Sequence, residues 1–197
     1  MIKRKQQPHW ARRILLSLGM ILGSSFASTA GIGFSAAAVQ LADGTVSFVQ
    51  VPQLVAAKTF NKGTGSMIAT YYFTVTVPSN AGESLQRLIL QQTQGTSVIK
   101  YNLAATRAYL EQSGRPTVGI KAEQLPANAG SIALTFDPPI TPGQTVTFSL
   151  VPVMNPSTAG VYLFSLTAFP QAERPNGQLL GLARLQFYNT GGRSGSQ

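Results

Sequence analysis

Three segments of the chain alternate apolar and polar residues with a period of two, and this pattern constrains the fold most strongly. They are Tyr71–Val77, Ser131–Phe136 and Thr145–Leu150, and they are rich in β-branched and aromatic residues. Such alternation is typical of strands with one buried face, whereas a helix requires apolar spacings of three and four. The inward positions of these segments, with two from a later apolar segment, predict a core of Phe73, Val75, Leu134, Phe136, Val146, Phe148, Leu150, Phe164 and Leu166.

Further strands and turns complete an all-β pattern. Val161–Phe169 and Leu179–Tyr188 are apolar on both faces and are expected to be central strands. Weaker patterns predict strands at Thr45–Val51, Leu85–Gln91, Val98–Leu103 and Thr117–Lys121. Only Ala104–Gln112 has helical character, and it could equally form a short crossover.

Turn residues separate these segments. Pro142-Gly143 suits a type II turn, and Asn176-Gly177 favours a type I′ hairpin, which Pro175 could lengthen. Short strands with regular turn signals predict an antiparallel two-sheet β-sandwich of immunoglobulin-like type over residues 43–188. The small polar residues of 189–197 predict a flexible tail.

The N-terminal segment resembles an export signal. A basic stretch up to Arg13 is followed by an apolar run, Ile14–Leu22, and then by small residues that end in Ser35-Ala36-Ala37-Ala38. This order predicts a signal peptide over residues 1–38, containing a signal helix, and a periplasmic or extracellular location. Two alternatives stay open: an uncleaved N-terminal anchor, and a twin-arginine signal at Arg12-Arg13.

Removal of residues 1–38 would change the chemistry of the chain. It would take away the only histidine, the only tryptophan and five of the fifteen basic residues, and the chain has no cysteine. The formal charge would fall from +9 to +4, with ten basic and six acidic residues. Because the remaining lysines and arginines are scattered, nucleic-acid binding is not expected.

Without histidine or cysteine, the usual catalytic and metal-binding sets are excluded. A Ser-His-Asp triad, a cysteine nucleophile and an ordinary zinc site all need one or the other. A glycosidase would need two carboxylates facing each other, but the acidic residues are expected to cap turns or to pair with Arg87, Arg174 or Arg184. Met67 and Met154 are expected to fill the core rather than to bind copper. The sequence therefore predicts no enzyme, no cofactor and no metal site.

Several short motifs, in order, resemble one family. They are Pro78-x-x-Ala81-Gly82-Glu83-x-Leu85-Gln86-Arg87-Leu88, Phe136-Asp137-Pro138-Pro139-x-x-Pro142-Gly143, Asn155-Pro156 followed by Gly160-Val161-Tyr162-Leu163-Phe164, Ala168-Phe169-Pro170, and Gly177-Gln178-x-x-Gly181. Over about Asp43 to Tyr188 the chain resembles the cyanobacterial domain-of-unknown-function family numbered 2808. The resemblance implies an exported single-domain protein and transfers no catalytic residue. Met154 departs from the expected pattern, in which a basic residue precedes Asn155-Pro156.

These observations favour an exported, non-enzymatic structural or interaction module of the periplasm or cell envelope. The alternative is a glycan-binding β-sandwich that acts on envelope polysaccharide. The candidate surface contacts are Tyr72, on a threonine-rich strand face, and Arg184; a covering strand or sheet could instead bury Tyr72. The expected partner is an envelope protein or polysaccharide, with membrane contact only through the signal segment before cleavage.

Overall fold

A computed structural model describes residues 39–126 and 130–189 of the chain. The expected signal peptide and the tail beyond Asn189 lie outside these residues. The described residues form strands joined by turns and loops: β1 (Val39–Gln40), β2 (Val46–Ser47), β3 (Gln53–Thr59), β4 (Tyr71–Thr76), β5 (Leu85–Gln94), β6 (Tyr101–Leu110), β7 (Thr117–Gln124), β8 (Ser131–Ile140), β9 (Thr145–Pro152), β10 (Gly160–Pro170) and β11 (Gln178–Phe187). None of the described residues forms a helix long and apolar enough to cross a membrane.

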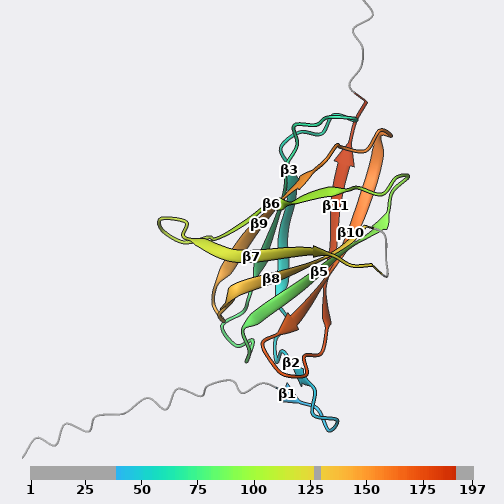
Figure 1. The fold of residues 1–197 in the computed structure, drawn as a ribbon. Helices are drawn as coiled ribbons and strands as arrows, with labels where there is room; N and C mark the ends of the chain where they lie inside the picture. The colour runs from blue at the N-terminus through green and yellow to red at the C-terminus, as the bar shows by residue number, and fades with distance from the viewer. Residues whose placement is uncertain (1–38, 127–129, 190–197) are drawn as a thin grey trace, which may run out of the picture. The chain divides into compact units, whose positions relative to one another are not determined.

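Nine of these strands form one continuous antiparallel sheet in the order β11-β10-β5-β8-β7-β6-β9-β4-β3 (Figure 1). The all-β antiparallel prediction is therefore confirmed, but the sheet is not divided into the two separate sheets that the sequence predicts. The reason lies in β7, which pairs with β8 over six residues. It also forms two residue pairs with β6, Ala108 opposite Val118 and Tyr109 opposite Thr117. These two pairs continue the sheet from one half of the domain into the other.

The two end strands of this order, β3 and β11, lie side by side, so the sheet is nearly closed into a barrel. Gly63 and Tyr188 form a parallel bridge just beyond the two strands, where Tyr188 N donates to Lys62 O at 2.9 Å. In the part of the chain that the structure describes, β3 and β11 share no ladder of hydrogen bonds along their lengths. We call this line of contact the seam.

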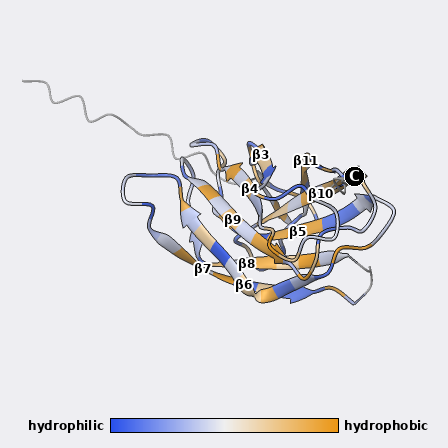
Figure 2. Ribbon diagram, turned by 90° about the horizontal axis from the view of Figure 1, so that it is seen from above, coloured by the Kyte–Doolittle hydropathy of each residue, from blue (hydrophilic) through white to orange (hydrophobic). Residues whose placement is uncertain are grey.

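The core fills the interior of the barrel, and all nine residues of the predicted core are fully buried. The Phe73 ring of β4 stacks on Phe148 of β9 with centroids 5.2 Å apart, and it meets Phe164 of β10 edge-on at 6.2 Å. The strands carry alternating hydrophobic and hydrophilic stretches (Figure 2). The predicted period of two therefore orients the side chains as expected.

Three local predictions have different outcomes. Pro142-Gly143 forms the expected turn, with Gly143 at a φ of 87° and Gln144 N donating to Thr141 O. The prediction of helical character at Ala104–Gln112 is wrong, because Tyr101–Leu110 forms β6 and pairs with β9. The type I′ hairpin at Asn176-Gly177 is also wrong: neither residue has a positive φ, and a longer loop joins β10 to β11.

Candidate functional site

One outward-facing row of side chains crosses four neighbouring strands. Lys58 of β3 lies opposite Tyr72 of β4, Tyr72 lies opposite Ser149 of β9, and Ser149 lies opposite Arg107 of β6. Tyr72 faces outward because its neighbours in β4, Tyr71 and Phe73, are buried. Its side chain is half-buried within the row, and Lys58 and Arg107 are exposed. The row therefore combines a half-buried tyrosine ring with two exposed cations.

A set of hydroxyl groups stabilises the neighbouring part of this face. Thr147 donates a hydrogen bond to Glu111 Oε1 at 2.8 Å, so the 2.7 Å contact between Thr74 and Thr147 requires Thr74 to be the donor. Thr76 and Thr145 form a similar cross-strand pair at 2.8 Å. Cross-strand threonine pairs of this kind stabilise a sheet and hold its side chains in fixed positions.

The second candidate residue, Arg184, lies in a polar groove of about 440 Å³ along the seam. Lys58 and Lys62, from β3 and the loop that follows it, line the same groove, as does the half-exposed Tyr188, which follows β11. Arg184 Nη2 donates to Gln186 Oε1 at 2.9 Å, which orients the guanidinium on the outer surface. Since Lys58 is also the cross-strand neighbour of Tyr72, both candidate residues lie on one continuous surface. We call Lys58, Lys62, Tyr72, Arg184 and Tyr188 the seam surface.

The electrostatics of the seam surface favour an anion. None of the described residues that line its groove carries a carboxylate, whereas three carry a positive charge. The charge of Lys58 acts on Glu111 electrostatically. The Glu111 carboxylate, however, already accepts a hydrogen bond from Thr147 and a 3.1 Å hydrogen bond from Arg115. The Thr147 hydrogen bond, then Arg115 and Lys58, lower the pKa of Glu111. The positive charge of the groove is therefore only partly balanced by the protein itself.

The other acidic side chains do not converge on this surface. Glu123 pairs with Lys121 at 2.6 Å, and Asp43 caps a turn by accepting hydrogen bonds from the backbone and side chain of Thr45. Turn capping by Asp43 agrees with the sequence prediction, but the ion pairs use Lys121 and Arg115 rather than the expected arginines. Among the described residues, no group of three acidic, histidine or cysteine side chains could hold a metal ion.

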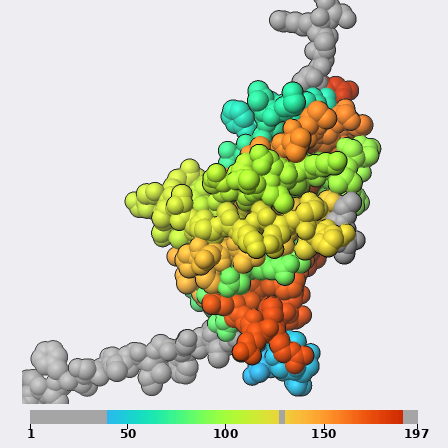
Figure 3. Space-filling view, in the orientation of Figure 1, coloured from blue at the N-terminus to red at the C-terminus, as the bar shows by residue number. Residues whose placement is uncertain are grey.

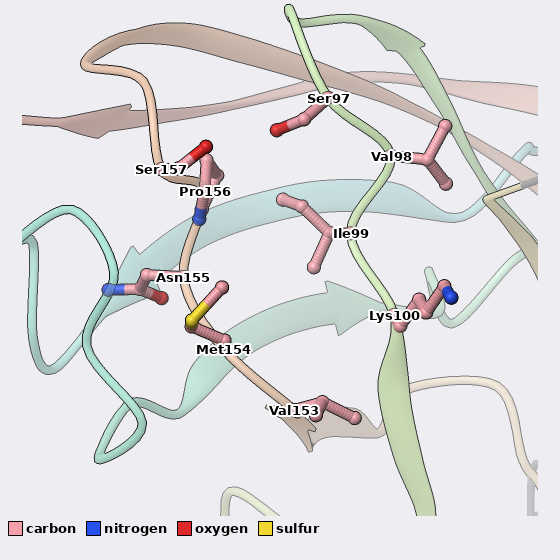
Figure 4. Close-up of a pocket in the computed structure, with 9 residues that line it drawn as sticks. All are labelled: Ser97, Val98, Ile99, Lys100, Val153, Met154, Asn155, Pro156 and Ser157. Atoms are coloured by element: carbon pink, nitrogen blue, oxygen red, sulfur yellow. The ribbon is translucent and has the colours of Figure 1, made fainter.

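A second, apolar hollow of about 200 Å³ lies between the β5–β6 and β9–β10 loops (Figure 4). Ile99 and Met154 face one another across it, and Val98 and Val153 are also among its lining residues. Met154 is exposed at 47%, and Met67, in another loop, is exposed at 75%. The expectation that the two methionines fill the core is therefore wrong.

Asn155, which lines this hollow, ties the β9–β10 loop to the β3–β4 loop. Its Nδ2 donates to Asn61 O at 3.1 Å and to Gly63 O at 2.8 Å, and its Oδ1 accepts a 2.7 Å hydrogen bond from the Tyr71 hydroxyl. Burial raises the pKa of Tyr71, so this phenol stays protonated and able to donate. The side chain of Asn155 is itself buried. The Asn155-Pro156 motif thus has a structural role.

The sequence named Tyr72 and Arg184 but missed Lys58, Lys62 and Tyr188. The position of Lys58 beside Tyr72 depends on the register between β3 and β4, and its proximity to Arg184 depends on the closure of the seam. No local pattern signals contact between strands so far apart in sequence. The structure shows that Lys58 faces outward beside buried Thr59, but the sequence before it, Leu54-Val55-Ala56-Ala57, is apolar throughout and has no alternation that would signal this.

Comparison with solved structures finds similar all-β domains at low sequence identity. The C-terminal domain of the Streptococcus pyogenes antigen I/II-family protein AspA is 14% identical, with a TM-score of 0.40 over 67% of this chain and 45% of that chain. The chain thus spans less than half the length of that streptococcal structure. The collagen-binding domain of a Staphylococcus aureus adhesin is 9% identical, with a TM-score of 0.37 over 68% of this chain and 98% of that chain.

A structure of enteroaggregative Escherichia coli AAF fimbriae is 11% identical, with a TM-score of 0.31 over 70% of this chain and all of that chain. No curated protein matches the sequence. The family model described as "Protein of unknown function (DUF2808)" matches residues 45–187, and it agrees with the resemblance carried by the sequence motifs. The chain therefore belongs to the DUF2808 family.

Proposed function

We propose that the protein is an exported, non-enzymatic binding module that recognises an acidic polysaccharide of the cell envelope through the seam surface. One observation carries this proposal: Lys58, Lys62 and Arg184 line a single polar groove in which no described residue supplies a carboxylate. Exposed cations whose charge the protein balances only in part favour an anionic ligand. The carboxylates of an acidic polysaccharide would pair with these three side chains.

The aromatic and hydroxyl groups of the same surface favour a sugar chain over a small anion. Tyr72 lies beside Lys58, and Tyr188 lines the groove. A tyrosine ring offers an apolar face to a sugar ring and a hydroxyl group to its polar edge. A row that runs from the groove across β4, β9 and β6 to Arg107 also suits an extended ligand.

Three of the six carboxylates of the chain have pKa values shifted in the direction that disfavours a role as general acid in hydrolysis. A glycosidase needs one carboxylic acid whose pKa is raised so that it can donate a proton. Hydrogen bonds from Thr147, Lys121 and Thr45 instead lower the pKa values of Glu111, Glu123 and Asp43. These three groups are ionised at neutral pH and are poor general acids.

Binding of polygalacturonate, an acidic polysaccharide, by the purified chain tests the proposal, with uncharged dextran as the control ligand. We expect calorimetry to detect binding of polygalacturonate only, with an affinity that falls as salt is added. The double variant Lys58→Ala/Arg184→Ala should lose about tenfold or more in affinity, since two exposed charge pairs are removed. Lys121→Ala, which removes an equally exposed cation on β7, should bind like the unmodified chain.

The aromatic contribution can be separated from charge. Tyr72→Phe keeps the ring and should bind nearly as well as the unmodified chain, whereas Tyr72→Ala should bind more weakly because the stacking surface is lost. Equal binding of dextran and polygalacturonate, or an equal loss in Lys121→Ala and in the double variant, would contradict a specific seam site. Absence of any polygalacturonate binding would refute the proposed ligand class.

A further inference from the structure

Three loops at one end of the barrel expose large apolar side chains. They are the β3–β4 loop (60–70), the β5–β6 loop (95–100) and the β9–β10 loop (153–159). Phe60, Met67 and Ile68 are the most exposed, at 85%, 75% and 79%. The full set, which we call the apolar end, is Phe60, Met67, Ile68, Val98, Val153 and Met154.

Backbone hydrogen bonds bring these loops together. Asn155 N donates to Ser66 O at 2.8 Å, and Gly65 N donates to Pro156 O at 3.0 Å, so the β3–β4 and β9–β10 loops run side by side (Figure 3). Val153 N donates to Lys100 O at 2.8 Å, which joins the β5–β6 loop to the same group. The apolar residues of the three loops therefore belong to one surface.

The loops are held in a conformation that keeps these side chains outside the core. The buried Asn155 side chain ties down the backbone at Asn61 and Gly63, at the start of the β3–β4 loop. Ala69 and Tyr71, which follow the exposed Met67 and Ile68, are buried and anchor the other end of that loop. Exposed apolar side chains on adjoining loops with a constrained backbone point to a binding partner.

The charges of the three loops indicate which partner fits. Their only charged residues are Lys62 and Lys100, and they contain no aspartate or glutamate. Phenylalanine and methionine suit a protein interface as well as a lipid surface, but protein interfaces are depleted in lysine, whereas apolar side chains flanked by lysine are typical of surfaces that enter a lipid headgroup region. The positive charge is complementary to anionic lipids.

We propose that the apolar end inserts its side chains into the interface of a membrane that contains anionic lipids. Phe60, Met67 and Ile68 enter the boundary between headgroups and acyl chains, and Lys62 and Lys100 contact the anionic headgroups. This membrane contact lies in the folded domain and is separate from the export segment to which the sequence assigns it. It shares Lys62 with the seam surface but can be tested separately, because polysaccharide binding does not use Met67 or Ile68.

The absence of cysteine allows a site-specific test in the full chain. Met67→Cys and Ser79→Cys each create one labelling site, the first in the apolar end and the second in the exposed β4–β5 turn. Each variant is labelled with the environment-sensitive fluorophore NBD and mixed with vesicles of phosphatidylcholine containing phosphatidylglycerol. Because both variants keep residues 1–38, any membrane contact through that segment is common to the two proteins.

We expect NBD at position 67 to show a blue shift and a several-fold rise in emission on anionic vesicles, with little change at position 79. In the labelled Met67→Cys chain, Lys62→Ala/Lys100→Ala should require about tenfold or more lipid for the same signal, and Lys121→Ala should not. An unchanged signal at position 67 would overturn the proposal and leave the apolar end to a protein partner. Equal responses at positions 67 and 79 would also overturn it.

Discussion

Asn155 shows how a single side chain can organise one end of the barrel. It satisfies two loop carbonyls and the buried hydroxyl of Tyr71, and its backbone N–H contacts a third residue of the same loop at Ser66. Tyr71 in turn packs its ring against Tyr101 and Phe187. The aromatic core and the exposed loops therefore depend on the same buried amide.

Replacing this amide should be costly. Asn155→Ala leaves the Tyr71 hydroxyl and two loop carbonyls without their partners, and we expect the free energy of unfolding to fall by about 2–4 kcal/mol. Urea unfolding measures the change, with Ser157→Ala, an exposed neighbour, as a control that should stay within about 0.5 kcal/mol. A loss below about 1 kcal/mol in Asn155→Ala would mean that the loops are held mainly by other contacts.

Glu111 predicts a small dependence of stability on acid pH. Because Thr147 and Arg115 lower its pKa in the folded protein, its contribution is present at neutral pH and is lost as the pH falls through that lowered value. Glu111→Gln should lower stability at pH 7 by less than about 1 kcal/mol, since the side chain is exposed. Urea titrations at pH 7 and near pH 2 should show that the difference in the free energy of unfolding between Glu111→Gln and the unmodified chain is smaller in acid. Glu173→Gln serves as the charge control, and a difference that is the same at both pH values would contradict the role of ionised Glu111.

At the scale of elements, β7 determines that the sheet is continuous. It shares six residue pairs with β8 but only two with β6, so the pairing of β6 with β7 is the narrowest link between the two halves of the sheet. Gly119 lies opposite Asp137 in this ladder, and a Cβ atom at position 119 would collide with the backbone carbonyl of Asp137. The close approach of the two backbones requires glycine here.

Gly119→Ala should therefore displace β7 from β8. We expect a loss of about 1–3 kcal/mol in the free energy of unfolding, the usual range for an inserted methyl group that has no space. Hydrogen exchange should report faster exchange of the β7 and β8 amides relative to β4 and β9. The control Thr117→Ser changes an exposed residue of the same strand and should leave both measurements nearly unchanged; similar exchange in all four strands of Gly119→Ala would contradict a local displacement.

The elements that the sequence predicts well are those whose buried face is fully apolar. In β4 and β9 the apolar alternation predicts three things at once: that the segment is a strand, which of its faces is buried, and which residues enter the core. These core residues are Phe73, Val75, Val146, Phe148 and Leu150. The prediction fails for β6 because its buried positions, Thr106 and Ala108, are small and produce no hydrophobic alternation. That segment becomes a strand because β9 pairs with it, and this tertiary effect overrides its local preference.

The candidate site was only partly predictable, for a related reason. The period of two shows that Tyr72 faces outward, but the joining of Tyr72 to Arg184 through Lys58 requires two facts that are not local: the β3–β4 register and the contact between β3 and β11. The single continuous sheet was missed because its continuity depends on the two residue pairs between β6 and β7.

At the scale of the whole barrel, the seam and the apolar end are two different surfaces with different chemistry. The seam gathers cations and tyrosines from β3, β4 and β11, whereas the apolar end gathers aliphatic and phenylalanine side chains from three loops. Lys62 is the residue that the two surfaces share. A module with these surfaces could bind a polysaccharide along its side while one end rests on a lipid surface.

The most direct test of the seam as the binding site is a titration of the ¹⁵N-labelled chain with short polygalacturonate oligomers, followed by amide chemical shifts. The proposed function predicts that the largest shifts fall on Lys58, Lys62, Tyr72 and Arg184 and their immediate neighbours. Met67 and Ile68, which lie in the apolar end, should change little. Shifts that cluster away from the seam, or no shifts at saturating oligomer, would contradict the proposed function.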